Sequence, residues 1–276
     1  MTGGPVPTAA FFDLDKTIIA RSSTLAFSGP FHAGGLITRR AMARSGYAHL
    51  VYMLGGADHD QMERMRAYLS GMVTGWDVQL VRDIVTETLD RLIQPVVYRE
   101  AAALIAEHKA AGRDVVIVSS SGAEVVEPIG AMLGADRVVA TRMVAVDGRY
   151  SGEIEFYAYG ETKAEAVRAL AREHGYDLEG SYAYSDSATD LPMLSTVGHP
   201  HAVNPDRALR REAQARGWPV LDFSHPTRLS TRLSTRQRTA LQALPRQRMP
   251  AVAAAVGAGA ATAGLLWYAA RRRERG

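Results

Sequence analysis

The stretch Ala-Ala-Phe-Phe-Asp-Leu-Asp-Lys-Thr, residues 9–17, has two acids where an apolar run ends. The run over residues 9–12 predicts a short buried strand, so Asp13 and Asp15 lie at its carboxyl end. In an open parallel α/β sheet, ligands bind at the carboxyl ends of the strands. One aspartate can be a nucleophile or metal ligand and the other an acid or base. The pattern favours a reactive site over the alternative, in which both acids merely open a turn.

The apolar segments that follow predict strands separated by helices. Further strands are expected over residues 114–118, 182–185, 198–203 and 219–223, with a hairpin over 138–156 that turns at Asp147-Gly148. Helices are expected over residues 98–111, 123–133, 164–174 and 206–216. This alternation predicts an α/β fold with a Rossmann-like, doubly wound parallel sheet.

Residues 21–96 interrupt this alternation. They have no strong strand pattern, and helices are expected over residues 36–54, 61–72 and 78–93. We therefore expect an inserted α-helical cap at 21–96, between the two parts of the catalytic core at 1–20 and 97–223. A basic linker (224–248), an apolar helix (249–270) and a basic tail (271–276) are expected to complete the chain.

Composition and charge limit the chemistry. The 276 residues are 47% hydrophobic, enough for a core, and include no cysteine, which excludes disulfides and a thiol nucleophile. Residues 1–222 contain 22 basic and 28 acidic residues, whereas residues 223–276 contain 10 arginines and one glutamate. Such a basic tail points to an anionic surface, either membrane lipid or nucleic acid. The N-terminus lacks the pattern of a signal peptide, so a cytoplasmic catalytic domain is expected.

Three serines end the predicted strand at 114–118. Ser119, Ser120 and Ser121 precede the predicted helix at 123–133, whose free N–H groups would face an anion held there. The alternative is that these serines only cap the helix.

Three charged residues are associated with later elements. Lys163 lies in the first turn of a predicted helix, where a cation is unfavourable for the helix dipole. This placement suggests a purpose other than helix stability, although a solvated surface lysine is the alternative. Asp186 and Asp190 follow the predicted strand at 182–185.

Four pieces now stand in order along the chain: Asp13-Leu14-Asp15-Lys16-Thr17, Ser119, Lys163, and Asp186-Ser187-Ala188-Thr189-Asp190. Together they resemble the motifs of the haloacid dehalogenase superfamily of phosphohydrolases, over residues 9–223. The helical insertion resembles the cap of the phosphoserine-phosphatase-like branch of that superfamily. The resemblance implies a phosphomonoester hydrolase that uses Mg²⁺.

The resemblance also implies residue roles. Asp13 would be the nucleophile that forms an aspartyl phosphate, and Asp15 would donate a proton to the leaving oxygen. Thr17 and Ser119, with the backbone N–H near Ser120, would hold the phosphoryl oxygens. Lys163 would neutralise charge on Asp13 and the phosphate.

The resemblance implies a metal site as well. Asp186 would ligate Mg²⁺ together with Asp13 and the backbone carbonyl of Asp15, and Asp190 would orient metal-bound water or Lys163. Phosphoryl transfer to a carboxylate needs such a cation because both groups are negative. Mg²⁺ prefers oxygen ligands, and no Cys or His cluster suggests zinc.

Several residues bear on the substrate. Asp15 favours phosphate ester hydrolysis over dehalogenation, because an alkoxide needs a proton on leaving and a halide does not. Residues 21–24 lack the acid with which phosphoserine phosphatases bind an amino group, so phosphoserine is not expected. Ser185 stands where many relatives have glycine, and little effect is expected. The predicted cap contains arginines that suit an anionic leaving group or are simply solvated: Arg39, Arg40, Arg44, Arg64 and Arg66.

The expected partner is a small phosphorylated substrate. A first alternative is a membrane lipid phosphate such as phosphatidylglycerophosphate, and a second is a non-catalytic phosphate sensor, which would not need Asp15. Nucleic acid is not expected as a partner, and the sequence indicates no oligomeric state.

The C-terminal segment is a candidate membrane anchor. Residues 249–270 are uncharged for 22 positions between Arg248 and Arg271, and Trp267 and Tyr268 resemble interfacial anchors. Alanine and glycine dominate the segment, so a helix on an anionic membrane surface and a soluble tail are the alternatives.

We expect the C-terminal helix to anchor the chain to the cell membrane. The full-length protein should therefore stay in the membrane fraction after carbonate washing. Recovery of the full-length protein in the soluble fraction would rule out the anchor.

Overall fold

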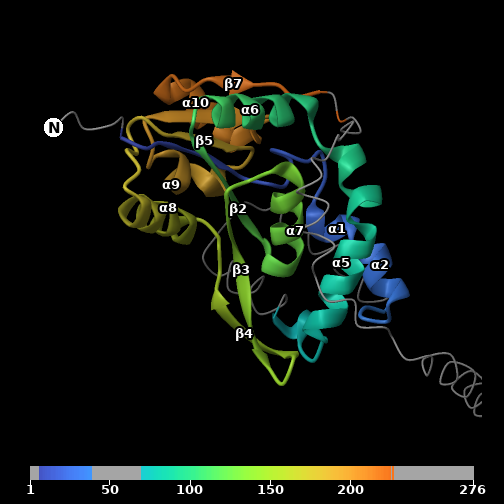
Figure 1. Cartoon of the computed structure of the whole chain (residues 1–276). Coiled ribbons are helices and arrows are strands. Elements are labelled where there is room, and N and C mark those ends of the chain that lie inside the picture. The colour runs from blue at the N-terminus through green and yellow to red at the C-terminus, as the bar shows by residue number, and fades with distance from the viewer. Residues whose placement is uncertain (1–5, 39–69, 225, 227–276) are drawn as a thin grey trace, which may run out of the picture. The chain divides into compact units, whose positions relative to one another are not determined.

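The computed structural model describes residues 6–38, 70–224 and 226, and its centre is a seven-stranded sheet (Figure 1). The strands are β1 (Ala9–Phe12), β2 (Asp114–Gly122), β3 (Arg137–Val146), β4 (Arg149–Phe156), β5 (Tyr182–Ser185), β6 (His199–Val203) and β7 (Val220–Leu221). They lie in the order β4-β3-β2-β1-β5-β6-β7. All neighbours are parallel except β3 and β4, which form the predicted antiparallel hairpin. The predicted α/β fold with a Rossmann-like parallel sheet is confirmed.

Helices follow the strands at most of the predicted positions. They are α1 (Ser23–Ala26), α2 (Ser28–Ala33), α5 (Val78–Leu92), α6 (Arg99–Ala110), α7 (Ala123–Leu133), α8 (Glu161–His174), α9 (Leu191–Leu194) and α10 (Arg207–Arg216). Asp77 caps α5, because its carboxylate accepts a hydrogen bond of 3.0 Å from the N–H of Leu80. α8 begins three residues earlier than predicted and ends at Gly175, which adopts a left-handed conformation with φ of 71°.

The helix predicted over residues 36–54 does not begin at residue 36. The residues Leu36–Thr38, at the start of the helix expected over 36–54, form bends and irregular chain, with glycines at 34 and 35 just before them. Gly35 has a φ of 77°, which ends α2 and turns the chain. The rest of that helix, and residues 61–69 of the next one, lie outside the described residues.

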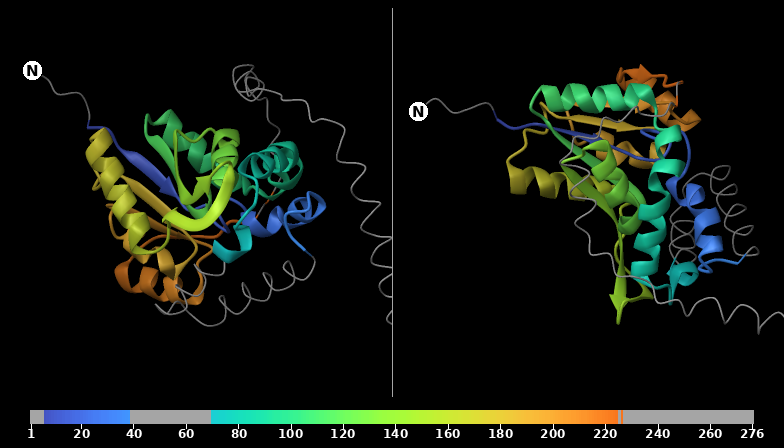
Figure 2. Two further views of the ribbon diagram at one scale, coloured as in Figure 1. Left: turned by 90° about the horizontal axis from the view of Figure 1, so that it is seen from below. Right: turned by 45° about the vertical axis from the view of Figure 1, so that its right-hand side comes forward.

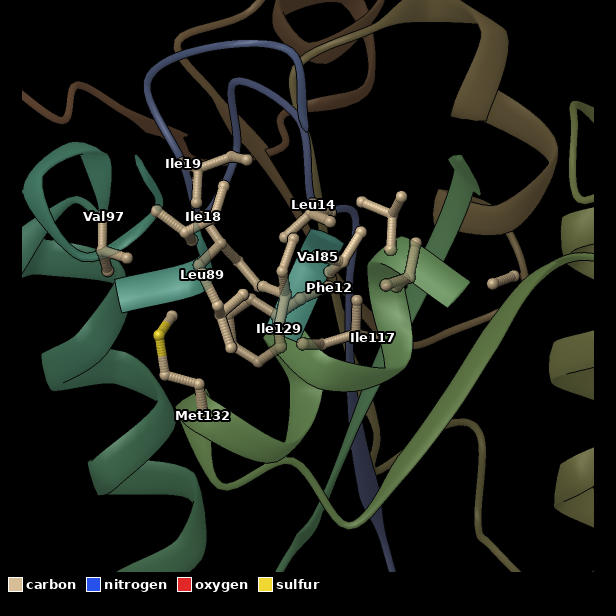
Figure 3. Packing of buried hydrophobic residues seen from close by; sticks show 14 of the residues in the cluster. Phe12, Leu14, Ile18, Ile19, Val85, Leu89, Val97, Ile117, Ile129 and Met132 are labelled. Atoms are coloured by element: carbon tan, nitrogen blue, oxygen red, sulfur yellow. The ribbon is translucent and has the colours of Figure 1, made fainter. Parts of the chain in front are cut away.

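The two faces of the sheet bury alternate residues of each strand. Ala10 and Phe12 pack in one hydrophobic cluster with α5, α6 and α7, whereas Ala9 and Phe11 pack in the other with α8, α9 and α10. Figure 2 shows these helices on both sides of the sheet, and Figure 3 shows part of the first cluster. Strands buried on both faces are expected to be continuously apolar, as β1 is.

The helical insertion shares its hydrophobic cluster with the sheet. Phe27 and Phe31, and Val85 and Leu89 of α5, are buried in the same cluster as Phe12. Backbone hydrogen bonds also join the end of the insertion to the β3–β4 hairpin: Gly75 N to Tyr150 O (2.8 Å), Tyr150 N to Trp76 O (3.0 Å) and Val78 N to Gly148 O (2.9 Å). The domain boundaries expected from the sequence stay a prediction.

The apolar segment 249–270, the basic linker after residue 226 and the tail lie outside the described residues. Among the residues that are described, no helix has both the length and the apolar character needed to cross a bilayer. The C-terminal anchor therefore stays a prediction.

Gly198 begins the turn into β6 at a place where no side chain fits. A Cβ atom there would lie 2.0 Å from the backbone carbonyl oxygen of Glu179. We expect Gly198→Ala to lower the free energy of unfolding by about 1–3 kcal/mol, because the backbone must shift to relieve the clash. Urea denaturation of the purified protein measures this change.

Gly29 is the matched control, because it lies in α2 and a Cβ there would meet no atom within 4 Å. Gly29→Ala should leave the free energy of unfolding unchanged or raise it by up to about 1 kcal/mol. Equal destabilisation by the two substitutions would contradict the clash.

Candidate active site

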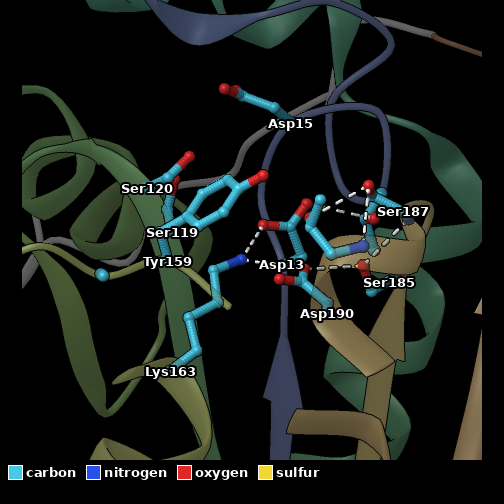
Figure 4. Close-up of polar contacts among 12 residues, drawn as sticks. Asp13, Asp15, Ser119, Ser120, Tyr159, Lys163, Ser185, Ser187 and Asp190 are labelled. Atoms are coloured by element: carbon cyan, nitrogen blue, oxygen red, sulfur yellow. Dashed lines mark hydrogen bonds and ion pairs between the residues drawn. The ribbon is translucent and has the colours of Figure 1, made fainter. Parts of the chain in front are cut away.

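The candidate site lies where three neighbouring strands end. Asp13 follows β1, Ser119 lies near the end of β2, and Asp186 follows β5. β1 pairs with β2 on one side and with β5 on the other, so these residues meet although they are far apart in sequence. The sheet thus places the predicted residues at one edge, as expected for ligand sites of open α/β sheets (Figure 4).

Lys163 is the centre of the buried charges. Its Nζ lies 2.8 Å from Oδ1 of Asp13 and 2.9 Å from Oδ2 of Asp190, and its side chain is only 3% exposed. Burial by itself would lower the pKa of Lys163, but the two carboxylates outweigh burial and raise it. Lys163 therefore stays protonated, and the alternative of a solvated surface lysine is wrong.

The position of Lys163 on α8 explains its burial. Lys163, Val167 and Ala171 are spaced four residues apart and are all buried, so they lie on one face of the helix. Val167 and Ala171 pack in the hydrophobic cluster with Phe11 of β1. Burying this apolar face carries the lysine under the end of β1, and its ammonium group reaches Asp13.

The carboxylates outnumber the lysine at this site. Burial raises the pKa of Asp13 to about 7, Lys163 opposes this rise, and Asp190 adds to it. Burial raises the pKa of Asp186 to about 8, and the negative charge of Asp13 adds to the rise while Lys16 opposes it. The ionised carboxylates at this site thus repel one another, and a bound cation would offset that repulsion.

A cation here would have few side-chain ligands. Within residues 6–38 and 70–224, no three or more histidine, aspartate or glutamate side chains are grouped to hold a metal ion. Mg²⁺ is commonly bound through one or two carboxylates, with water and substrate phosphate as the other ligands. The excess negative charge and the oxygen donors at this site fit that ion.

Hydroxyl groups line the site beside Asp13. Thr17 is fully buried, and its Oγ1 lies 3.4 Å from Oδ2 of Asp13, to which it donates. Ser119 is 1% exposed, and its Oγ accepts a hydrogen bond of 3.2 Å from the N–H of Ser121. Ser120 is partly buried beside it, and its carbonyl accepts from Thr141. Figure 4 shows Ser119 and Ser120 on the β2 side of the Asp13 carboxylate.

The alternative that the serines only cap α7 is wrong. β2 continues through all three serines to Gly122, with a register shift against β3 between Ser119 and Gly122. Gly122 is the N-cap residue of α7 and makes no side-chain capping bond. The serine hydroxyls are therefore available to groups at the site.

Asp15 has different surroundings from Asp13. Its Oδ1 accepts a hydrogen bond of 2.7 Å from the N–H of Ser23, and its Oδ2 accepts one of 3.2 Å from Oγ of Ser121. Burial raises the pKa of Asp15, and these hydrogen bonds oppose the rise. In Figure 4 its carboxylate lies apart from the Lys163 ion pairs, above Ser120.

The sequence did not indicate several members of this site. Ser23 and Ser121 hold Asp15. Ser121 belongs to the serine run expected at the site, but no pattern indicated that it or Ser23 would contact Asp15. Ser185 was expected to have little effect, yet its Oγ donates a hydrogen bond of 2.7 Å to Oδ2 of Asp190. Tyr159 projects beside Ser119 and Lys163 from the turn before α8, and its ring stacks on that of Tyr157 (Figure 4).

The arginines expected to select the leaving group, Arg39, Arg40, Arg44, Arg64 and Arg66, lie outside the described residues.

Known proteins are similar in sequence to this chain. A Streptomyces azureus protein named inhibition of morphological differentiation protein is 67% identical, over 96% of this chain and 94% of that protein. A probable phosphatase of Mycobacterium tuberculosis is 57% identical, over 98% of this chain and 92% of that protein.

Solved structures share the fold. A Bordetella pertussis protein of unknown function has a TM-score of 0.69 and 30% identity, over 79% of this chain and 99% of that one. A substrate-bound phosphoserine phosphatase has a TM-score of 0.60 over 80% of this chain and 94% of that one; at 20% identity this shows a common fold. The model of the haloacid dehalogenase-like hydrolase family matches residues 10–195. The family expected from the four motifs is confirmed, and the chain belongs to the haloacid dehalogenase-like hydrolases.

Proposed function

We propose that this chain is a phosphatase that hydrolyses a small phosphomonoester through an aspartyl phosphate on Asp13, with Mg²⁺ as its cofactor. The observation that supports this most is the buried ion pair of 2.8 Å between Lys163 and Asp13 at the carboxyl end of β1. The name of the probable phosphatase that is 57% identical supports the same reaction.

Asp13 is the nucleophile in this proposal. Lys163 pairs with one of its oxygens and opposes the rise in its pKa that burial causes, which favours the ionised, nucleophilic form. A carboxylate can attack phosphorus, and the phosphoryl group is then held on Asp13 until water removes it. Asp15 supplies the proton for the leaving oxygen and later accepts one from the attacking water.

The phosphoryl oxygens bind to the neutral and cationic donors around Asp13. Thr17 and Ser119 offer hydroxyl groups, the backbone N–H near Ser120 offers another donor, and Lys163 carries a positive charge. Fixed donors of this kind stabilise the charge that develops during transfer. Asp190 receives a second hydrogen bond from Ser185 and holds Lys163 in place.

Asp13, Asp186 and the backbone carbonyl of Asp15 would hold the Mg²⁺. The bound ion would neutralise the buried carboxylates and the phosphate, which lets Asp13 approach an anionic substrate. The electrostatics favour this role, because burial and the neighbouring carboxylates raise the pKa of Asp186 although Lys16 and Lys163 oppose the rise.

Replacing the nucleophile tests the reaction. Asp13→Asn should lower the release of phosphate from p-nitrophenyl phosphate by at least about 1000-fold, because the amide cannot form the covalent intermediate. EDTA should abolish wild-type activity, and added Mg²⁺ should restore it. Phosphate release is measured on the full chain.

Asp222→Asn is the control, because Asp222 is 77% exposed and pairs only at the surface with Arg210. It should leave the activity unchanged. Wild-type activity in Asp13→Asn would exclude the aspartyl phosphate. A folded, Mg²⁺-binding wild type that hydrolyses no phosphomonoester would favour a phosphate sensor.

Replacing a proposed metal ligand tests the cofactor. The folded-state pKa of Asp186 is raised, so ionising this group destabilises the metal-free protein as pH rises from about 4 to about 8. Asp186→Asn should therefore raise the melting temperature of the metal-free protein, and by more at pH 8.5 than at pH 5.

Mg²⁺ should stabilise the wild type with the same dependence on pH. It competes with protons for Asp186, so it should raise the melting temperature of the wild type more at pH 8.5 than at pH 5. The same Mg²⁺ concentration should stabilise Asp186→Asn far less. Equal stabilisation of both proteins by Mg²⁺ would exclude Asp186 as a ligand.

A further inference from the structure

We propose that Ser121 is a positioning residue for Asp15, which fixes the carboxylate oxygen from which the proton is delivered. This inference rests on the function proposed above and adds a residue that the four motifs do not include. Ser121 lies in β2, two residues beyond Ser119, and is 8% exposed. It therefore joins the core strand to the group that would protonate the leaving oxygen.

The Ser121 hydroxyl makes a complete set of hydrogen bonds. Its Oγ lies 3.2 Å from Oδ2 of Asp15, 2.9 Å from Oγ of Ser23 and 3.3 Å from Oγ1 of Thr24. A hydroxyl group has one proton to donate and two lone pairs that accept. Three partners use all three positions, so the orientation of this hydroxyl depends on which partner accepts its proton.

The N–H of Ser23 determines which oxygen of Asp15 can be protonated. A backbone N–H only donates, so Oδ1 of Asp15, 2.7 Å away, must remain an acceptor in either protonation state. A protonated carboxyl oxygen is the weaker acceptor, so this hydrogen bond favours the proton of the carboxylic acid on Oδ2, the oxygen that faces Ser121.

Ser121 can accommodate both states of Asp15. When Asp15 is ionised, the Ser121 hydroxyl donates to Oδ2 and accepts from Ser23 and Thr24. When Oδ2 carries a proton, Ser121 can accept from it and donate to Ser23 or Thr24, because each of those contacts works in either direction. The carboxyl group thus keeps its position through a cycle in which it gives up a proton and regains it.

The step that depends on this position is the departure of the leaving group. A carboxylate oxygen of Asp13 forms a bond to phosphorus as the bond from phosphorus to the ester oxygen breaks. The electron pair of the broken bond goes to the ester oxygen, which replaces Ser121 as the acceptor of the Oδ2 proton and takes that proton. An alcohol leaves, and Asp15 becomes a carboxylate that Ser121 and Ser23 stabilise.

The effect of the leaving group on kcat/KM tests whether Ser121 positions Asp15. A good leaving group departs without a proton, whereas a poor one needs the acid. We expect Ser121→Ala to lower kcat/KM for phenyl phosphate by about 10-fold or more, and for the more acidic p-nitrophenyl leaving group by less than about 3-fold. The ratio kcat/KM is the appropriate measure, because it excludes the later hydrolysis of the aspartyl phosphate.

Three variants separate positioning from a structural effect. Ser121→Thr keeps the hydroxyl and should restore the activity toward phenyl phosphate. Ser22→Ala removes the hydroxyl that caps α1 but does not contact Asp15, so it should leave the ratio of the two substrates unchanged. In an Asp15→Asn background, Ser121→Ala should have no further effect on that ratio, because Ser121 acts through Asp15.

An equal loss for both substrates, or no loss, in Ser121→Ala would overturn the proposal. A further selective loss in the Asp15→Asn background would also overturn it. Asp13→Asn should abolish the hydrolysis of both substrates. If Asp13→Asn stays active, the proposed aspartyl-phosphate reaction is wrong, whatever the ratio of the two substrates in Ser121→Ala.

Discussion

The burial of one lysine between two carboxylates, those of Asp13 and Asp190, is the constraint on which this site depends. An ion pair taken out of water is stable only when its geometry and its other hydrogen bonds are good, and removing one partner of such a pair typically costs about 3–5 kcal/mol. Lys163 meets this condition with two contacts below 3 Å, to Asp13 and Asp190. The raised pKa values of Asp13 and Asp186 show that ionised carboxylates are unfavourable here, and a bound cation would stabilise them.

The sheet order brings these charges together. β1 is the central strand, and its parallel neighbours β2 and β5 end on the same side of the sheet, at the carboxyl ends of the strands. The apolar residues of α8 pack against the face of the sheet that contains Phe11. This packing places Lys163 beside Asp13 at the carboxyl end of β1. The same hydrophobic contacts that stabilise the fold therefore position the lysine.

Two aspartates only two positions apart have separate surroundings. Asp13 lies among acids and is paired with Lys163, whereas Asp15 is turned toward the hydroxyl of Ser121 and the N–H of Ser23. Carboxyl groups placed in such different environments can serve as nucleophile and as acid in one reaction. Ser23 belongs to α1, so the segment that begins the helical insertion takes part in holding the acid.

The sequence by itself determined the strands, most of the helices in the core and the four motifs, because apolar periodicity and the polar residues at strand ends are local patterns. β1, β2, α7 and the hairpin turn at Asp147-Gly148 were predictable for this reason. Only the tertiary structure decided that Ser121 and Ser23 bind Asp15, that Ser185 binds Asp190, and that the serines of β2 do not cap α7. These contacts join segments brought together by strand order and by packing against the sheet, and neither leaves a pattern in the local sequence.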